Sequence, residues 1–150
     1  MPNARNFFTK EQQEDIRHAI MNAELDTSGE IRVHIENTCT GDALDRALII
    51  FTKLEMEKTD NRNGVLIYLA VKNRKFAIIG DTGIHAAVTE IFWDSIRNRM
   101  MDHFRENHFT EGLIEAITET GKKLKTYFPY KTDDKNELSD EISFNDHVNQ

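Results

Sequence analysis

The sequence predicts one α/β domain built on a small mixed sheet, with helices packed on that sheet. Three observations lead to this fold class. Residues 30–36 alternate polar and apolar, as a strand with one buried face does. Residues 64–71 are continuously apolar, and a polar turn then leads into a second apolar run that ends at Gly80. Elsewhere, apolar residues recur every three or four positions, which is the helical period.

The first half of the chain reads as helix, strand, helix. Thr9 and Gln12 have the spacing of a capping box, so a helix is predicted from there to about Leu25. The strand 30–36 follows. The side chains of this strand that are predicted to point outward are those of Glu30, Arg32, His34 and Glu36. A second helix is predicted from Ala43 through Met56.

The apolar run 64–71 predicts a central strand that is covered on both faces. The turn 72–75 and the short run 76–79 complete a hairpin, so the third strand is antiparallel to the second. Because a helix separates the first two strands, these are expected to be parallel. The element order is therefore α-β-α-β-β-α-α once the C-terminal helices are included.

The C-terminal half is predicted to be helical up to Pro129. Apolar positions from Ile84 to Phe104 indicate a long helical stretch that bends or breaks once, and a final helix follows Thr110. The domain is thus expected to span residues 1–129. Residues 130–150 contain two lysines against six acidic residues and few apolar ones, and they read as a disordered acidic tail.

Composition excludes several classes of protein. No apolar run approaches the roughly twenty residues that cross a bilayer, and the N-terminus has no apolar signal region. Membrane insertion is therefore not expected, and the predicted location is cytoplasmic. A single cysteine, Cys39, excludes an intrachain disulfide and a cysteine-based zinc site. A net charge of -7 argues against nucleic acid binding, which needs a basic surface.

From about Phe8 to Pro129, the order of elements and short motifs resembles the TPM domain family. The matching motifs are Ser28-Gly29-Glu30-Ile31, Asn63-Gly64-Val65-Leu66, and the segment 104–113 that enters the final helix. The chain departs from the family's Gly-aromatic-Gly loop, where it has Gly80-Asp81-Thr82-Gly83. The resemblance implies acid-phosphatase activity in some plant members and protein assembly or receptor modulation in others.

Chain direction predicts where a cation could bind. The start of the first strand (Glu30), the start of the second (Asn63) and the end of the third (Asp81) share one end of the sheet. Their oxygens are of the kind that Ca²⁺ or Mg²⁺ accepts, with Glu30 and Asp81 as the charged metal ligands. The alternative is that Asp81 or Thr82 merely caps the next helix.

Further residues near this end are candidates for binding a ligand. Arg62 could hold a carboxylate or phosphate, or could simply pair with Glu30 at the surface. His85 could complete a cation's shell, and Trp93 could rim the pocket or belong to the core.

The opposite end of the sheet offers a competing site. Ligands in open α/β sheets favour the carboxyl ends of parallel strands, here the loop 37–41. That loop could bind an anion, but it has no Lys or Arg and is followed by Asp42, so a turn and helix cap is the simpler interpretation. Cys39 is interpreted as an inert thiol.

Two functions follow from these observations. The first is a non-catalytic binding or assembly module for a protein partner, with a divalent cation at the acidic end of the sheet. Its partner would bind there or at the tail motif 142–144, unless the tail is a plain solubilising extension. The alternative is a metal-assisted phosphomonoester hydrolase, in which a cation held by Glu30, Asn63 and Asp81 polarises a phosphoryl oxygen. No catalytic residue is assigned.

Overall fold

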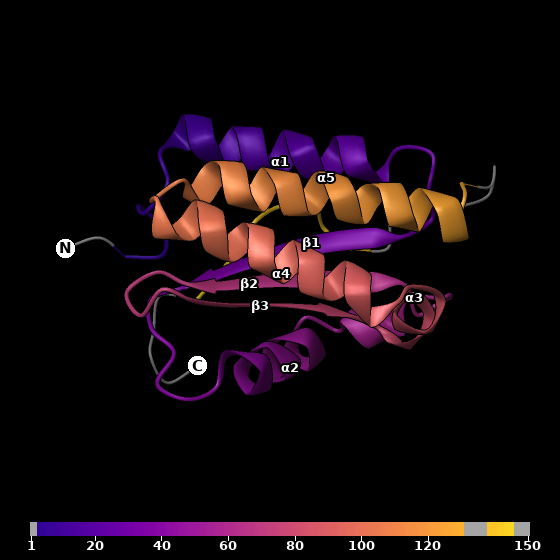
Figure 1. Cartoon of the computed structure of the whole chain (residues 1–150), viewed down its shortest axis with the longest axis horizontal. Coiled ribbons are helices and arrows are strands. Elements are labelled where there is room, and N and C mark those ends of the chain that lie inside the picture. The colour runs from indigo at the N-terminus through magenta and orange to yellow at the C-terminus, as the bar shows by residue number, and fades with distance from the viewer. Residues whose placement is uncertain (1–2, 131–137, 146–150) are drawn as a thin grey trace.

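The computed structural model describes residues 3–130 and 138–145. Within them, a four-stranded mixed sheet has the order β3-β2-β1-β4. Helices α1, α5 and α4 cover one face of the sheet and α2 lies on the other, with α3 at one end (Figure 1). The elements are α1 (Lys10–Glu24), β1 (Glu30–Glu36), α2 (Ala43–Lys53), η1 (Met56–Lys58), β2 (Gly64–Ala70), β3 (Lys75–Gly80), α3 (Thr82–Ala87), α4 (Glu90–Arg105), α5 (Phe109–Tyr127) and β4 (Ser143–Asn145).

The predicted fold class and element order are confirmed. Strands β1 and β2 are parallel, in a register that pairs Glu30 with Gly64, and β3 returns antiparallel with Gly80 opposite Val65. The predicted break in the long helical stretch falls at Val88 and Thr89, between α3 and α4. The start of β1, the start of β2 and the end of β3 therefore meet at one end of the sheet.

Burial follows the predicted pattern in β2. Every residue of this strand is buried because helices cover both of its faces. Side chains on one face, such as Ile67, pack with the core beneath α1, α4 and α5. Side chains on the other face, such as Leu66 and Tyr68, pack against α2. Two apolar layers thus hold the sheet, and β2 belongs to both.

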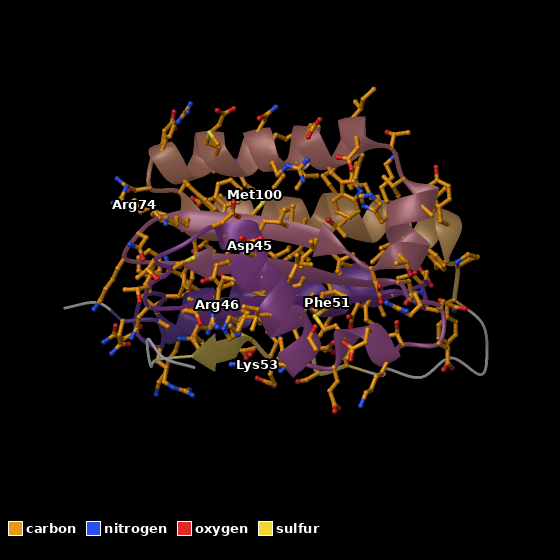
Figure 2. The ribbon with its side chains drawn as sticks, turned by 90° about the horizontal axis from the view of Figure 1, so that it is seen from below. Asp45, Arg46, Phe51, Lys53, Arg74 and Met100 are labelled. Carbon is orange, nitrogen blue, oxygen red and sulfur yellow. The ribbon has the colours of Figure 1, made fainter. Side chains whose placement is uncertain are left out.

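The polar face of β1 was predicted to point outward, and this is wrong. Glu30, His34 and Glu36 are each no more than 3% exposed, and Arg32 is partly buried. Helix α2 packs mainly on β2 and β3 (Figure 2), but its Arg46 bonds to Glu36, so α2 covers the carboxyl end of this face. The C-terminal segment contributes, because the amide of Leu138 donates to Glu30 and the hydroxyl of Ser143 lies 2.9 Å from Nδ1 of His34.

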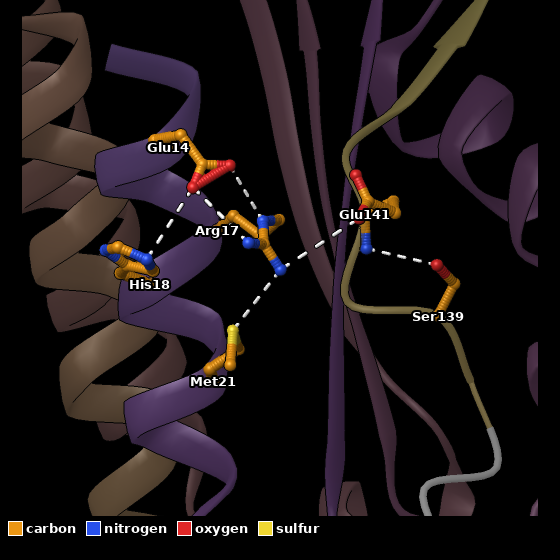
Figure 3. Close-up of polar contacts among 6 residues, drawn as sticks. All are labelled: Glu14, Arg17, His18, Met21, Ser139 and Glu141. Atoms are coloured by element: carbon orange, nitrogen blue, oxygen red, sulfur yellow. Dashed lines mark hydrogen bonds and ion pairs between the residues drawn. The ribbon is translucent and has the colours of Figure 1, made fainter. Parts of the chain in front are cut away.

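The disorder predicted for residues 130–150 does not hold for residues 138–145. Strand β4 pairs in parallel with His34–Glu36 of β1. Phe144 packs against the main core, and the guanidinium of Arg5 lies over its ring at 5.1 Å. Figure 3 shows Arg17 of α1 reaching Glu141 of this segment at 4.0 Å. One aromatic residue between two polar ones suffices for a short strand when an adjacent strand offers open backbone groups. The rest of the predicted tail, 131–137 and 146–150, lies outside the described residues.

No helix in the described ranges is long and apolar enough to cross a membrane.

Gly83 provides a test of how the loop before β2 is held. A Cβ at Gly83 would lie 2.2 Å from the carbonyl oxygen of Asn61 and 2.6 Å from that of Arg62. We expect Gly83→Ala to lower the free energy of unfolding by about 1–3 kcal/mol, because backbone atoms must move to accept the methyl group. Gly41→Ala is the control, since nothing lies within 4 Å of its Cβ position. Equal stability of the two variants in urea unfolding would contradict this account.

Candidate functional site

The predicted site residues start from neighbouring backbone positions. Glu30 is opposite Gly64 in β2, and the amide of Asp81 donates to the carbonyl of Gly64 at 2.9 Å. The amide of Glu30 also donates to the carbonyl of Asn63 at 3.4 Å. The side chains then diverge into separate environments.

Asp81 is held by Arg62 and by the start of α3. The guanidinium of Arg62 makes two hydrogen bonds of 2.7 Å to the Asp81 carboxylate, and this bonding raises the pKa of Arg62. The amide of Thr82 donates to the same carboxylate at 2.7 Å. These contacts match the helix-cap interpretation, with Arg62 paired to Asp81 rather than to Glu30.

Glu30 lies instead in a group of carboxyl side chains that we call the acidic pocket: Glu24 at the end of α1, Glu30, and Asp140 of the C-terminal segment. They line a hollow of about 340 Å³ together with Ser28 and Tyr130. One oxygen of Glu30 accepts from the amide of Leu138, and one of Glu24 accepts from the amide of Ile31 at 2.9 Å.

Glu24 shows how strongly these carboxyl groups interact. Burial raises its pKa, and the hydrogen bond to Asp140 and the charges of Asp140 and Glu30 raise it further, to about 10, against the opposing effect of the Ile31 amide. At neutral pH, Glu24 is therefore protonated and donates to Asp140. Burial is therefore the main reason that Glu24 keeps its proton, and the neighbouring carboxyl groups add to this effect.

Asn63 lies next to the acidic pocket and is 1% exposed. Its Nδ2 donates to the hydroxyl of Ser28 at 3.3 Å, and its backbone amide donates to Thr59. Its carboxamide oxygen has no hydrogen-bond donor among the residues that the structure describes. A buried acceptor of this kind is costly unless a donor or a cation satisfies it. Across residues 3–130 and 138–145, no three His, Cys, Asp or Glu side chains are already gathered as a metal site.

The remaining predicted ligand residues lie elsewhere. His85 is largely exposed, with Nε2 3.4 Å from Glu90, and Trp93 is 2% exposed in the core. Both line a separate groove beside Gly80, of about 440 Å³. The structure therefore brings Asn63 close to Glu30 and ties Arg62 to Asp81. The backbone amide of His85 donates to the carbonyl of Asp81 at 2.8 Å, but the side chains of His85 and Trp93 line a different hollow from Glu30.

The carboxyl end of the parallel strands contains a buried polar network that the sequence analysis did not predict. Glu36, at the end of β1, accepts two hydrogen bonds from Arg46 of α2, at 2.9 and 2.7 Å, and one from the hydroxyl of Tyr68. His34 Nε2 lies 3.6 Å from the same carboxylate. The alternation of β1 had identified His34 and Glu36, but no sequence signal linked them to Arg46.

The network keeps Glu36 charged. Burial alone would raise the pKa of Glu36, but the donor groups of His34, Arg46 and Tyr68 outweigh burial and lower it to about 2. Burial and the neighbouring Glu36 raise the pKa of Tyr68. Since Arg46 and Tyr68 are committed to Glu36, this network holds α2 on the sheet.

The loop 37–41 behaves as a turn followed by a cap. Asp42 accepts from the amides of Leu44 and Asp45, which starts α2. Cys39 is buried, and its thiol lies 3.4 Å from the carbonyl of Gly41. A hollow of about 300 Å³ lies beside this loop, and Arg46, which lines it, is already bonded to Glu36.

Comparison with known proteins identifies relatives of this chain. A family model described as the TPM domain matches residues 3–123. The BA42 protein from the psychrophilic bacterium Bizionia argentinensis, solved by NMR, is 45% identical with a TM-score of 0.86, and the match covers 93% of this chain and 96% of that one. No curated protein matches this chain.

Two more distant structures share the fold alone. The N-terminal domain of a P. gingivalis protein is 20% identical, with a TM-score of 0.66 and coverage of 81% of this chain and 78% of that one. The N-terminal domain of the cg2496 protein of Corynebacterium glutamicum is 14% identical, with a TM-score of 0.63 and coverage of 96% and 84%.

The network around Glu36 predicts a pH dependence. Because the pKa of Glu36 is lower in the folded state, its contribution to stability is present above about pH 4.5 and is lost as the pH falls towards about 2. We expect Glu36→Gln to be much less stable than wild type at pH 6, with the difference shrinking as the pH approaches 2. Asp102→Asn, on the exposed face of α4, serves as the control. A stability difference that does not change with pH in urea titrations would contradict the assignment.

Proposed function

The chain belongs to the TPM domain family, and we propose that it is a non-catalytic binding module that takes up a divalent cation, Ca²⁺ or Mg²⁺, in the acidic pocket. The observation that supports this proposal is that Glu24, Glu30 and Asp140 line one open hollow, in which a bound cation would have to draw their carboxyl groups together. In the absence of a cation, their mutual repulsion is relieved by a proton on Glu24, whose pKa is raised to about 10.

A divalent cation satisfies the same requirement better than a proton does. It neutralises two carboxylates, and hard oxygen ligands are the ones that Ca²⁺ and Mg²⁺ prefer. Mg²⁺ in particular is commonly held by one or two carboxylates while keeping several waters. The three carboxyl groups of the pocket therefore provide enough charge for either ion.

The buried oxygen of Asn63 adds a neutral ligand to this set. The carboxamide nitrogen of Asn63 bonds to Ser28, which lines the pocket, and the carboxamide oxygen lacks a donor among the described residues. Asp81 is less suited to be a ligand, because its carboxylate already accepts from Arg62 and Thr82. We therefore propose Glu30 with Glu24, Asp140 and Asn63 as ligands, and Asp81 as a support for the loop that carries Asn63.

Cation binding would link three parts of the chain. Glu24 closes α1, Glu30 opens β1, and Asp140 precedes β4. A shared cation would fasten the C-terminal segment to the sheet, so that cation concentration controls the surface that this segment presents to a protein partner. This is how the module would serve in assembly.

The hydrolase alternative gains no support from these contacts. It requires Asp81 to hold a cation that polarises a phosphoryl oxygen, while the Asp81 carboxylate is bonded to a guanidinium and an amide. Binding without catalysis is the function that the geometry favours.

Cation binding is testable with the free ions. We expect CaCl₂ or MgCl₂ to bind with a Kd of about 10⁻⁵ to 10⁻³ M, and to stabilise the protein by about 2.7 kcal/mol at a concentration one hundred times the Kd. Isothermal titration calorimetry and thermal unfolding measure the two quantities.

Variants localise the site. Glu30→Gln keeps an acceptor for the Leu138 amide but removes a charge, so we expect it to weaken binding at least about tenfold. Asp81→Asn should leave the Kd nearly unchanged, and Asp102→Asn, on α4, controls for net charge. If Asp81→Asn abolished binding and Glu30→Gln did not, the ligand set would be wrong; if wild type bound neither ion, the proposal would fail.

Proton release provides an independent test. Because Glu24 is protonated at neutral pH, cation binding should release about one proton, and calorimetry in buffers of different ionisation enthalpy should detect it. Glu24→Gln should release none. Without a cation, the raised pKa of Glu24 stabilises the folded state fully below about pH 4.5, and this contribution is lost as the pH rises towards about 10. Glu24→Gln has no carboxyl group to titrate. The variant should therefore be more stable than wild type at pH 8. A wild type that releases no proton would contradict the assigned state of Glu24.

A further inference from the structure

Strand β3 has an open side. It pairs with β2 on one side, and no strand among residues 3–130 and 138–145 pairs with the other. The hydrogen bond from Asp81 to Gly64 sets the alternation of the antiparallel ladder. It directs the backbone groups of Ile79 and Ala77 towards β2. Those of Phe76, Ile78 and Gly80 consequently point away from the sheet.

This open side forms the floor of a groove of about 440 Å³. Residues 42–44 at the start of α2 form one wall, and Glu90, Trp93 and Arg97 of α4 form the other. Figure 1 shows α4 and α2 on opposite faces of the sheet, above and below β3. Residues 76–80 of β3 all line the groove.

Two side chains make the groove suitable for a polypeptide. The indole nitrogen of Trp93 is buried and has no acceptor among the described residues, so a ligand carbonyl could satisfy it if the indole turned towards the groove. Leu44, at the lip formed by α2, is about half exposed and offers apolar contact. The groove thus combines three outward backbone N–H groups, three outward carbonyls, a buried donor and an apolar lip.

We propose that the open side of β3 binds an extended peptide segment of a partner protein, rich in β-branched residues and flanked by Lys or Arg, as an added strand. Backbone hydrogen bonds to Phe76, Ile78 and Gly80 provide the affinity, as in other cases of strand addition. This surface is distinct from the acidic pocket, so it does not depend on the proposed cation site.

Charge determines the flanks of the segment. Among the charged residues of the groove, Asp42 and Glu90 outnumber Arg97, and Arg97 is already bonded to Asp94 and Glu90. The whole chain carries a net charge of -7. A second copy would bring the same negative charge and its own α2 and α4 beside its β3, whereas a single basic-flanked segment meets neither obstacle.

The test uses an acetylated and amidated heptapeptide, Lys-Val-Thr-Val-Thr-Val-Lys, added to the full chain. Amide hydrogen exchange followed by NMR should slow about tenfold or more at Phe76, Ile78 and Gly80 when the peptide is saturating. The amides of Ala77 and Ile79 should not change, because they are already bonded to β2. The same peptide with N-methyl groups on every Val and Thr should have no effect, since it cannot pair as a strand.

Matched variants separate the groove from the rest of α2. Leu44→Lys places a positive charge at the lip and should weaken peptide binding by about fivefold or more. Leu48→Lys, which is equally exposed one turn along α2 and does not line the groove, should keep the wild-type affinity. Unchanged exchange at the three amides would overturn the proposal. So would protection that rises with protein concentration without peptide, because a second copy would then occupy the edge.

Discussion

The parallel pairing of β1 with β2 is the constraint on which the rest of the molecule depends. This register places Glu30 opposite Gly64, at the amino end of the parallel strands. It places Glu36 opposite Ala70, at their carboxyl end. The acidic pocket forms at the amino end and the Glu36 network at the carboxyl end. This register also pairs His34 with Tyr68 and Glu36 with Ala70, which places the hydroxyl of Tyr68 within hydrogen-bond reach of the Glu36 carboxylate.

The buried carboxyl groups near the two ends of β1 have pKa values that are shifted in opposite directions. Glu36 is surrounded by donors, so its pKa falls to about 2 and it stays charged. Glu24 is largely buried and also faces other carboxyl groups, so its pKa rises to about 10 and it keeps a proton. A satisfied network of the first kind holds helix and sheet together. A cluster of carboxyl groups, such as the acidic pocket, gains most from a bound cation. We therefore interpret the Glu36 network as structural and propose the acidic pocket as functional.

Much of the architecture was predictable because local patterns agree with the fold. The capping box at Thr9, the alternation of 30–36 and the apolar run of β2 each produced the element expected of them. The convergence of Glu30, Asn63 and the end of β3 also followed from chain direction. The pairing of Arg62 with Asp81 did not, because it depends on side-chain orientations within one end of the sheet. Asp140 lies too far along the chain from Glu30 to be associated by spacing, and no local pattern distinguishes Glu24 from the other acidic residues of the first helix.

The sequence by itself determined the fold class, the strand directions and the end of the sheet where acidic groups gather, because periodicity and crossover rules act on the backbone alone. Tertiary structure decided which of those groups share a pocket. Residues 138–145 help to bury the polar face of β1 by adding β4 beside it, and an acidic, weakly apolar segment gives no local sign of that docking. Its strand forms because β1 offers an open ladder of backbone donors and acceptors, a property of the folded sheet and not of the tail.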